Sequence, residues 1–280
     1  MNQRPAVPRD HFARIAPQWS QLGPPLRPSP DDIAVVQRVV SQLGPRARAV
    51  VLGLTPEIVG CDWPADVALY AVDHSPAMMA ALWPPDAGPA DAHALLGDWC
   101  ALPVPADSVD LVAGDGCYVL LDHPEGYAAL TREVRRVLRR DGRYVIRVFL
   151  RPDRAETVAE VAQALAKGTI GSVHALKLRL LAAVHGASGK GSRLDDVWRA
   201  WSAMAPRLPT HLAGTRGWTP EEIVGVDAYC GMQSYYYLPT LAELRHAFRP
   251  WFVEIECAWG RHELADRCPT FIFAAAETSR

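Results

Sequence analysis

The sequence lacks the features that would place the chain in a membrane or outside the cell. No apolar run approaches the ~20 residues that a membrane-spanning helix needs, and the N-terminus, MNQRPAVPRDHF, has no apolar core of a secretion signal. The six cysteines form no C-x-x-C pair, so their spacing indicates neither a structural zinc site nor a redox motif. These absences predict a cytoplasmic protein with scattered, reduced thiols, no metal and no membrane partner.

An excess of charge of one sign is also missing. The chain has 29 Lys and Arg against 31 Asp and Glu, a formal net charge of -2, so no overall field attracts nucleic acid or an anionic membrane. No basic stretch interleaved with aromatic residues occurs, which argues against a nucleic-acid substrate. With 49% hydrophobic and 21% charged residues over 280 positions, the composition is that of a globular protein with a substantial core.

What the sequence does contain is an alternation of strand and helix patterns. Short apolar runs that end in Gly or Asp alternate with amphipathic segments that begin at helix-capping residues. This alternation predicts parallel βαβ units in an α/β, doubly wound, mostly parallel sheet. The expected strands are 50–53, 69–73, 94–96, 109–114 and 143–150, and the main expected helices are 31–43, 76–83 and 124–140.

The pattern divides the chain into four parts. Residues 1–44 are a proline-rich lead-in and a helix, and residues 45–150 form the ligand-binding α/β core. Residues 151–250 have a mostly helical pattern, which predicts an insertion before the last strands. Residues 251–280 offer two strands, expected as a C-terminal antiparallel hairpin that completes the sheet.

Acidic residues follow two of the expected strands, at the sheet edge where doubly wound folds bind ligands. Asp73 lies about 20 residues beyond Gly53, where a carboxylate suits the two hydroxyls of an adenosine ribose. An acid at a strand end also occurs without any ligand. Asp98-Trp99 follows the third strand, and this pair suits an adenine, unless Asp98 is only a cap beside a partly buried tryptophan.

Four motifs in the right order resemble the class I S-adenosylmethionine (SAM) dependent methyltransferases. The family's VD-x-SP-x-M is matched by residues 72–78, and its GD followed by LP-x-P-x-x-S-x-D-x-V is matched by 97–98 and 102–112. Residues 132–146, REVRRVLRRDGRYVI, are similar to the family's E-x-x-RVLRPGG segment. The resemblance covers roughly residues 45–150.

The resemblance implies a Rossmann-like SAM-binding core, S-adenosylhomocysteine (SAH) as product, and direct SN2 methyl transfer to a small molecule. It also places the segment 114–118 beside the methionine part of SAM and the transferred methyl group, although a plain loop is the alternative there. By analogy with the family's small-molecule members, residues 1–44 are expected to cover the site and residues 151–250 to form a substrate lid, with Trp19 and Arg27 of the lead-in closing over the cofactor. The cofactor-binding residues expected in the core are Gly53, Thr55, Pro56, Glu57, Asp73, His74, Met78, Asp98, Trp99, Gly114, Asp115 and Gly116.

Glycine is scarce where the family has most of it. The family's G-x-G-x-G is Gly53-Leu54-Thr55-Pro56-Glu57 here, and Val51 replaces the acid that commonly precedes it. Side chains at positions 55 and 57 require a loop of a different shape. Since SAM presents an ammonium here rather than phosphates, Glu57 is expected to supply the missing negative charge. A helix first-turn acid beside the macrodipole is the alternative.

The candidate catalytic residues lie at the fourth strand end and in the lid. An oxygen or nitrogen acceptor needs a base for its proton. Because consecutive tyrosines cannot all face one core, the run 235–237 is expected to turn at least one ring toward a cavity. The candidates are Tyr118, His123, His211 and Tyr236, with His11 and His262 as further histidines and Arg216 for an anionic substrate group.

Three functions remain open at this point. The first is SAM-dependent methyl transfer, and the second is non-methyl chemistry on SAM such as cyclisation or elimination. The third is a catalytically inactive SAM-binding subunit of a heteromer, which the missing glycines favour and the intact Asp73 and Asp98-Trp99 oppose. A homodimer or heterodimer is compatible with each. A nicotinamide dehydrogenase is the weakest alternative, because G-x-G-x-x-G is absent.

Overall fold

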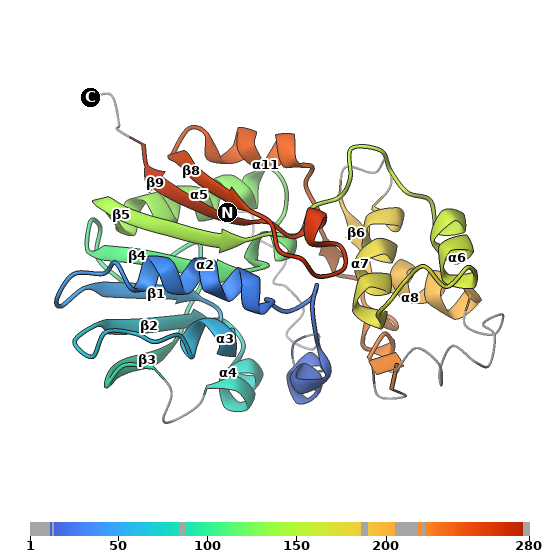
Figure 1. Cartoon of the computed structure of the whole chain (residues 1–280), viewed down its shortest axis with the longest axis horizontal. Coiled ribbons are helices and arrows are strands. Elements are labelled where there is room, and N and C mark those ends of the chain that lie inside the picture. The colour runs from blue at the N-terminus through green and yellow to red at the C-terminus, as the bar shows by residue number, and fades with distance from the viewer. Residues whose placement is uncertain are drawn as a thin grey trace, which may run out of the picture.

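A seven-stranded sheet forms the centre of the computed structural model, which describes residues 12, 14–83, 88–185, 190–204, 218–219, 222–223 and 225–276 (Figure 1). The strand order is β3-β2-β1-β4-β5-β9-β8. The first five strands pair in parallel, and β9 pairs antiparallel with both β5 and β8. This confirms the predicted doubly wound α/β sheet with a C-terminal antiparallel hairpin. The strands are β1 (Arg48–Leu52), β2 (Ala68–Asp73), β3 (Asp91–Leu96), β4 (Val109–Asp115), β5 (Leu138–Arg147), β8 (Phe252–Ala258) and β9 (Thr270–Ala275).

Helices cover both faces of this sheet, and each face has its own apolar core. One core joins the sheet to α2, α3 and α4, and the other joins it to α5 and α11. On the first side, the 3-10 helix η1 packs beside α4. The helices are η1 (Ala16–Gln21), α2 (Pro30–Val40), α3 (Pro56–Val59), α4 (Pro76–Leu82), α5 (Glu125–Val137) and α11 (Leu241–Phe248).

The start of α2 is fixed by a capping box that also reaches the sheet. Ser29 accepts a hydrogen bond from the backbone of Asp32, and the Asp32 carboxylate accepts one from the backbone of Ser29. The second carboxylate oxygen of Asp32 accepts a hydrogen bond of 3.1 Å from the hydroxyl of Thr270 on β9. The chain that precedes α2 is therefore held at the carboxyl edge of the central strands.

The segment between β5 and α11 builds a separate apolar cluster beyond the carboxyl end of β5 (Figure 1). The 3-10 helix η2 (Cys117–Leu120) joins the two parts, because the backbone N–H of Tyr237 donates to the carbonyl of Val119. None of the helices in the described part of the chain has the length and apolar character needed to cross a membrane. The elements of this segment are α6 (Val158–Ala166), α7 (Val173–Val184), β6 (Ser192–Arg193), α8 (Leu194–Met204), η4 (Asp227–Tyr229) and β7 (Tyr235–Tyr236).

Two details differ from the sequence-based expectation. The helix expected at 124–140 ends at Val137, because Arg139 donates to Asp110 of β4 at 2.6 Å and the chain from Leu138 is already extended. Residues 235–236, expected in a mostly helical lid, form a short strand that pairs with β6. Tertiary pairing overrides local helix propensity at both places.

The ring of Phe248 should be a main contributor to the stability of the α5–α11 side. It is fully buried, with ring centroids 5.0 Å from Tyr118 and 4.8 Å from Phe273. We expect Phe248→Ala to lower the free energy of unfolding by about 3–5 kcal/mol in urea denaturation. Val253→Ala on the exposed face of β8 is the control, expected to change it by less than about 0.5 kcal/mol. Equal losses in the two variants would contradict this packing.

Candidate functional site

The loop after β1 turns at a residue that has to be glycine. Gly53 has a φ of +89°, a conformation that side chains disfavour, and its N–H donates to the carbonyl of Val72 at 2.8 Å. The indole N–H of Trp99 donates to the same carbonyl at 2.6 Å, and its ring covers Gly53. Thr55 is buried at the N-cap of α3. The loop without its further glycines is therefore closed by Trp99 and continues directly into a short helix.

The end of β2 carries the predicted ribose-binding acid. Asp73 is buried, and one of its oxygens accepts a hydrogen bond of 2.8 Å from the backbone of Ser75. Burial raises the pKa of Asp73, against the lowering effect of that hydrogen bond and of His74. Beside it lies an open pocket of about 320 Å³. The pocket is lined by His74, Pro76, Leu96 and Gly97.

Residues 19–29, called the strap below, cross the carboxyl edge of the sheet and pair with the loop after β1. The Arg27 guanidinium binds one carboxylate oxygen of Glu57 through Nε and Nη2, each at 2.7 Å. It also donates to the carbonyl of Trp19 and lies 5.7 Å from the centre of that indole ring. Glu57 stands in the first turn of α3, so both roles considered for it from the sequence meet a competing partner in Arg27.

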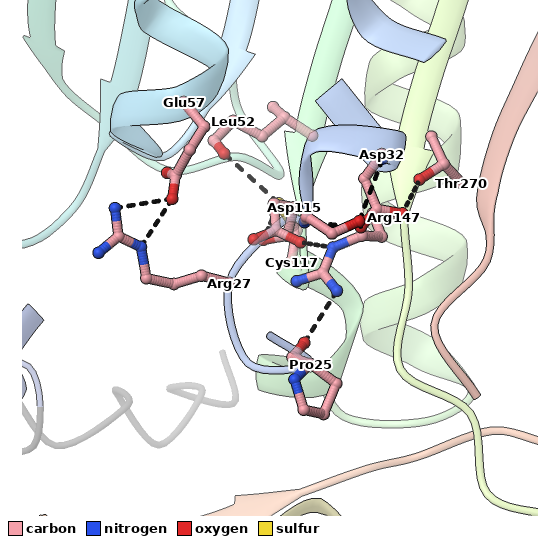
Figure 2. Close-up of polar contacts among 10 residues, drawn as sticks. Pro25, Arg27, Asp32, Leu52, Glu57, Asp115, Cys117, Arg147 and Thr270 are labelled. Carbon is pink, nitrogen blue, oxygen red and sulfur yellow. Dashed lines mark hydrogen bonds and ion pairs between the residues drawn. The ribbon is translucent and has the colours of Figure 1, made fainter. Parts of the chain in front are cut away.

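A buried ion pair also holds the strap, at a residue two positions before Arg27. Arg147, at the end of β5, donates through Nε to Asp115 at the end of β4 at 2.7 Å, and through Nη1 to the carbonyl of Pro25 at 2.8 Å. Burial raises the pKa of Asp115, although the guanidinium beside it acts in the opposite direction. Figure 2 shows this pair and the Arg27–Glu57 pair on either side of the end of β1 at Leu52.

Several buried polar atoms around this edge have no hydrogen-bond partner within the described residues. Buried polar groups in folded proteins are nearly always satisfied, so a group of exceptions at one edge calls for a ligand. The set contains an acceptor, a cation and two ring nitrogens. Its members are Glu57 Oε2, Arg147 Nη2, Trp19 Nε1 and His74 Nε2.

The remaining predicted cofactor residues have mixed positions. Met78 is buried in the core at the first turn of α4, where its N–H donates to Ser75. Asp98 is exposed, and one carboxylate oxygen caps its own turn at the N–H of Cys100. Trp99 is too buried to stack openly on a ligand, which agrees with the alternative of a partly buried tryptophan. Gly116 has a φ of +64° and turns the chain into η2.

Two of the candidate catalytic residues do not reach the edge. Tyr118 is fully buried between the sheet, α5 and α11, and its nearest polar partner is the hydroxyl of Tyr144 at 3.4 Å. Tyr236 is buried in the apolar cluster of the insertion, beside Tyr229. Burial raises the pKa of both phenols well above its usual value, so neither loses its proton at neutral pH. Tyr118 and Tyr236 stay predictions as catalytic residues, and neither ring reaches the carboxyl edge of the sheet.

The candidate histidines remain predictions. His123 stacks on Tyr237 at 4.3 Å between their ring centroids, and burial lowers its pKa. His262 lies against Gly260, and both its ring nitrogens are buried without a partner in the described chain. Of the tyrosine run, Tyr235 is exposed. His211, His11 and Arg216 lie outside the described residues.

Three basic side chains were not predicted from the sequence. Arg147 ends β5 directly after a short apolar run, and His174 and Lys177 stand three residues apart in the almost wholly buried helix α7. The sequence does mark the two residues of α7. A helix that is apolar all round is buried, and a lysine is rarely buried without a partner. Within the described ranges, no group of His, Cys, Asp and Glu is arranged to hold a metal.

A family profile described as "Methyltransferase domain" matches residues 59–146. By this match, residues 59–146 belong to a methyltransferase domain. SAM is the cofactor of such a domain, and methyl transfer is its activity. The matched range begins after the loop from Gly53 to Glu57, so the altered loop lies outside it. No curated protein sequence matches the chain.

Three solved structures are similar to this chain. A putative Zn-dependent alcohol dehydrogenase from Rhodobacter sphaeroides is 12% identical, with 98% of this chain and 100% of that chain covered and a TM-score of 0.61. A structure of the complex between the Haloferax volcanii Trm112 methyltransferase activator and the putative methyltransferase is 13% identical. The match covers 98% of this chain and 100% of that chain, with a TM-score of 0.55. A possible exported protein from Bordetella parapertussis is 16% identical, with 86% of this chain covered and a TM-score of 0.49. The match covers 66% of that protein, so this chain spans just under two thirds of its length. At such low identity the first two structures, with TM-scores above 0.5, show the fold alone.

The buried lysine of α7 should cost the protein stability. Burial lowers the pKa of Lys177 from 10.5 to about 8. Below pH 8 the charged amine is therefore unfavourable in the folded state, and Lys177→Met should raise the free energy of unfolding near neutral pH by about 3 kcal/mol. Between the two pKa values the unfolded chain binds more protons, so the stability of the unsubstituted protein rises with pH and the gain disappears near pH 10.5.

Urea denaturation near pH 7 and near pH 10.5 checks this expectation. Lys167→Met is the matched control, because Lys167 is exposed at the end of α6 and its removal should leave stability unchanged at both pH values. A loss of stability in Lys177→Met near neutral pH would mean that the amine stabilises the fold.

Proposed function

We propose that this protein transfers the methyl group of SAM to a small molecule at the carboxyl edge of β1, β2, β4 and β5, under the strap. The observation that carries the proposal is the group of buried, unpartnered polar atoms at that edge, which combines an anionic acceptor with a cationic donor. The methionine part of SAM has the complementary charges, an ammonium and a carboxylate.

In this proposal Glu57 and Arg147 hold the methionine part of the cofactor. Glu57 Oε2 accepts from the ammonium while its other oxygen keeps Arg27, and Arg147 Nη2 donates to the carboxylate while its other nitrogens keep Asp115 and Pro25. Asp73 accepts from the ribose hydroxyls, and the pocket beside His74 takes the adenine. The residues present fit the cofactor without moving the ion pairs that already exist.

The cofactor brings an activated methyl group, so the protein has to orient the acceptor and exclude water. The strap is held at the carboxyl edge through Arg147, and η2 connects that edge to the insertion, so both parts are placed to orient a small acceptor. The absence of a basic surface stripe and the net charge of -2 agree with such an acceptor rather than nucleic acid. A cytoplasmic location is part of the proposal, and the scattered cysteines without a C-x-x-C pair agree with it.

The alternative of a SAM-binding subunit in a heteromer has one supporting likeness. The Haloferax structure similar to this chain is a complex of a methyltransferase activator with a putative methyltransferase. The other alternative, non-methyl chemistry on SAM, would use the same contacts between Glu57, Arg147, Asp73 and the cofactor. Mass analysis of the product separates these cases: an added methyl group with one SAH per turnover supports methyl transfer, and a product without a new methyl group supports the non-methyl reaction.

Calorimetric titration with SAH tests the cofactor site. We expect micromolar binding to the unsubstituted protein and at least tenfold weaker binding to Asp73→Ala, because a buried carboxylate that accepts from two hydroxyls is lost. Asp91→Ala removes an exposed carboxylate at the start of β3, so it should bind SAH normally. Absence of binding to the folded, cofactor-free protein would overturn the proposed site.

The Arg27–Glu57 pair should control how fast the cofactor leaves. Both side chains are about one-fifth exposed, so the pair is partly screened and its effect on stability is small. We expect Arg27→Met to raise the dissociation rate of SAH several-fold in stopped-flow measurements, because the strap loses its contact with the loop after β1. Arg38→Met, which breaks the exposed pair with Glu256, should leave that rate unchanged. Equal dissociation rates in all three proteins would remove the strap from cofactor retention.

A further inference from the structure

Lys177 is buried in the insertion without a carboxylate partner. It is 3% exposed on α7, its amine donates to the carbonyl of Gly225 at 3.3 Å, and it lies 4.9 Å from the centre of the Tyr229 ring. No carboxylate of the described residues forms an ion pair with it, and its other neighbours belong to an apolar cluster. A buried ammonium with one long hydrogen bond and a ring face leaves most of its desolvation cost without compensation.

The chain uses lysine rarely, which makes this position stand out. Only three of the 29 basic residues are lysines, Lys167, Lys177 and Lys190, and the other two are exposed. Arginine is the residue that pairs with carboxylates throughout the structure. A compact amine at a buried position is suited to a ligand that brings its own negative charge.

His174 extends the same face of α7 toward the strap. It lies one turn before Lys177 and is 6% exposed; its Nδ1 is buried without a partner in the described chain, and its Nε2 is 3.6 Å from Glu222. Its ring packs against Gly23, where an added Cβ would lie 3.2 Å from the ring. Gly23 is two residues from Pro25, which accepts from Arg147, so the strap lies between this face of α7 and the sheet edge.

We propose that Lys177 and His174 form an anion-binding subsite for the methyl acceptor, and that the acceptor is a hydrophobic carboxylic acid. The carboxylate accepts hydrogen bonds from the amine of Lys177 and from His174 Nδ1. The apolar body of the acceptor packs on the aromatic and aliphatic side chains around Tyr229, with its reacting atom toward the strap. This inference rests on the proposed function, because the acceptor must share the site with SAM.

The cofactor does not account for these two groups. Its ammonium and carboxylate have Glu57 and Arg147 at the strand ends, whereas Lys177 belongs to the insertion and contacts η4 and the carbonyl of Gly225. Burial lowers the pKa of Lys177 to about 8, so the amine is still mostly protonated at pH 7 and available to an anion.

Binding of simple carboxylates to the SAH-loaded protein tests the subsite. The probes are benzoate and phenylacetate, each with its uncharged amide as control, followed by ligand-observed NMR. We expect both acids to bind with at least tenfold lower dissociation constants than their amides, and this preference to disappear in Lys177→Met. In Lys167→Met the preference should remain.

Each other outcome has a definite meaning. Normal SAH binding with no preference for the acids, or a preference that survives in Lys177→Met, overturns the subsite and leaves the proposed function standing. Loss of SAH binding in Lys177→Met would assign the lysine to the cofactor and also overturns the subsite. Failure of the unsubstituted protein to bind SAH overturns the proposed function itself.

A second measurement does not depend on the shape of the acid. Cyanate is small enough to enter a ligand site, and it carbamylates unprotonated amines, so a reachable Lys177 with a lowered pKa should react faster than Lys167 and Lys190 in the same sample. Peptide mass spectrometry reads all three sites. Modification of Lys177 that benzoate suppresses supports the subsite, and an unreactive Lys177 beside reactive exposed lysines contradicts it.

Discussion

The carboxyl edge of this sheet depends on the buried ion pair between Asp115 and Arg147. The two residues end neighbouring parallel strands, and the same guanidinium reaches the carbonyl of Pro25 in the strap. Removing either partner of such a pair leaves an uncompensated buried charge, which costs about 3–5 kcal/mol. The N-terminal strap is therefore not a loose lead-in, because its position is tied to the same charge that joins β4 to β5.

Much of the fold could be predicted because buried parallel strands leave a local signal. The apolar run before Gly53 and the VD before His74-Ser75-Pro76 identify β1 and β2 together with the edge at which a ligand binds. The contacts that close the site leave no such signal. Arg27 and Glu57 are 30 residues apart, and Pro25 and Arg147 are 122 apart. No periodicity connects residues at those separations, so only the folded chain reveals their pairing.

Tyr118 illustrates how a motif can locate a strand end without fixing the direction of the side chain that follows. The sequence GDG locates the end of β4, but it does not specify the face to which the next residue points. Gly116 takes a left-handed conformation and starts η2, which sends the Tyr118 ring into the core beside α5. Lys177 is the opposite case. The sequence already shows a lysine within an apolar helix, but only the structure shows which residues surround α7 and therefore that the amine has no carboxylate partner among the described residues.

A single carbonyl sets the spacing of the loops after β1 and β3. Val72 accepts hydrogen bonds from both the N–H of Gly53 and the indole of Trp99, which occupies both lone pairs of one oxygen. The loops after β1 and β3 are thus both hydrogen-bonded to the same backbone oxygen of β2, which fixes their positions relative to each other. In relatives that keep these two hydrogen bonds, the loops would hold the same positions. Differences in base or sugar preference would then arise from the side chains that line the pocket, at His74 and Leu96.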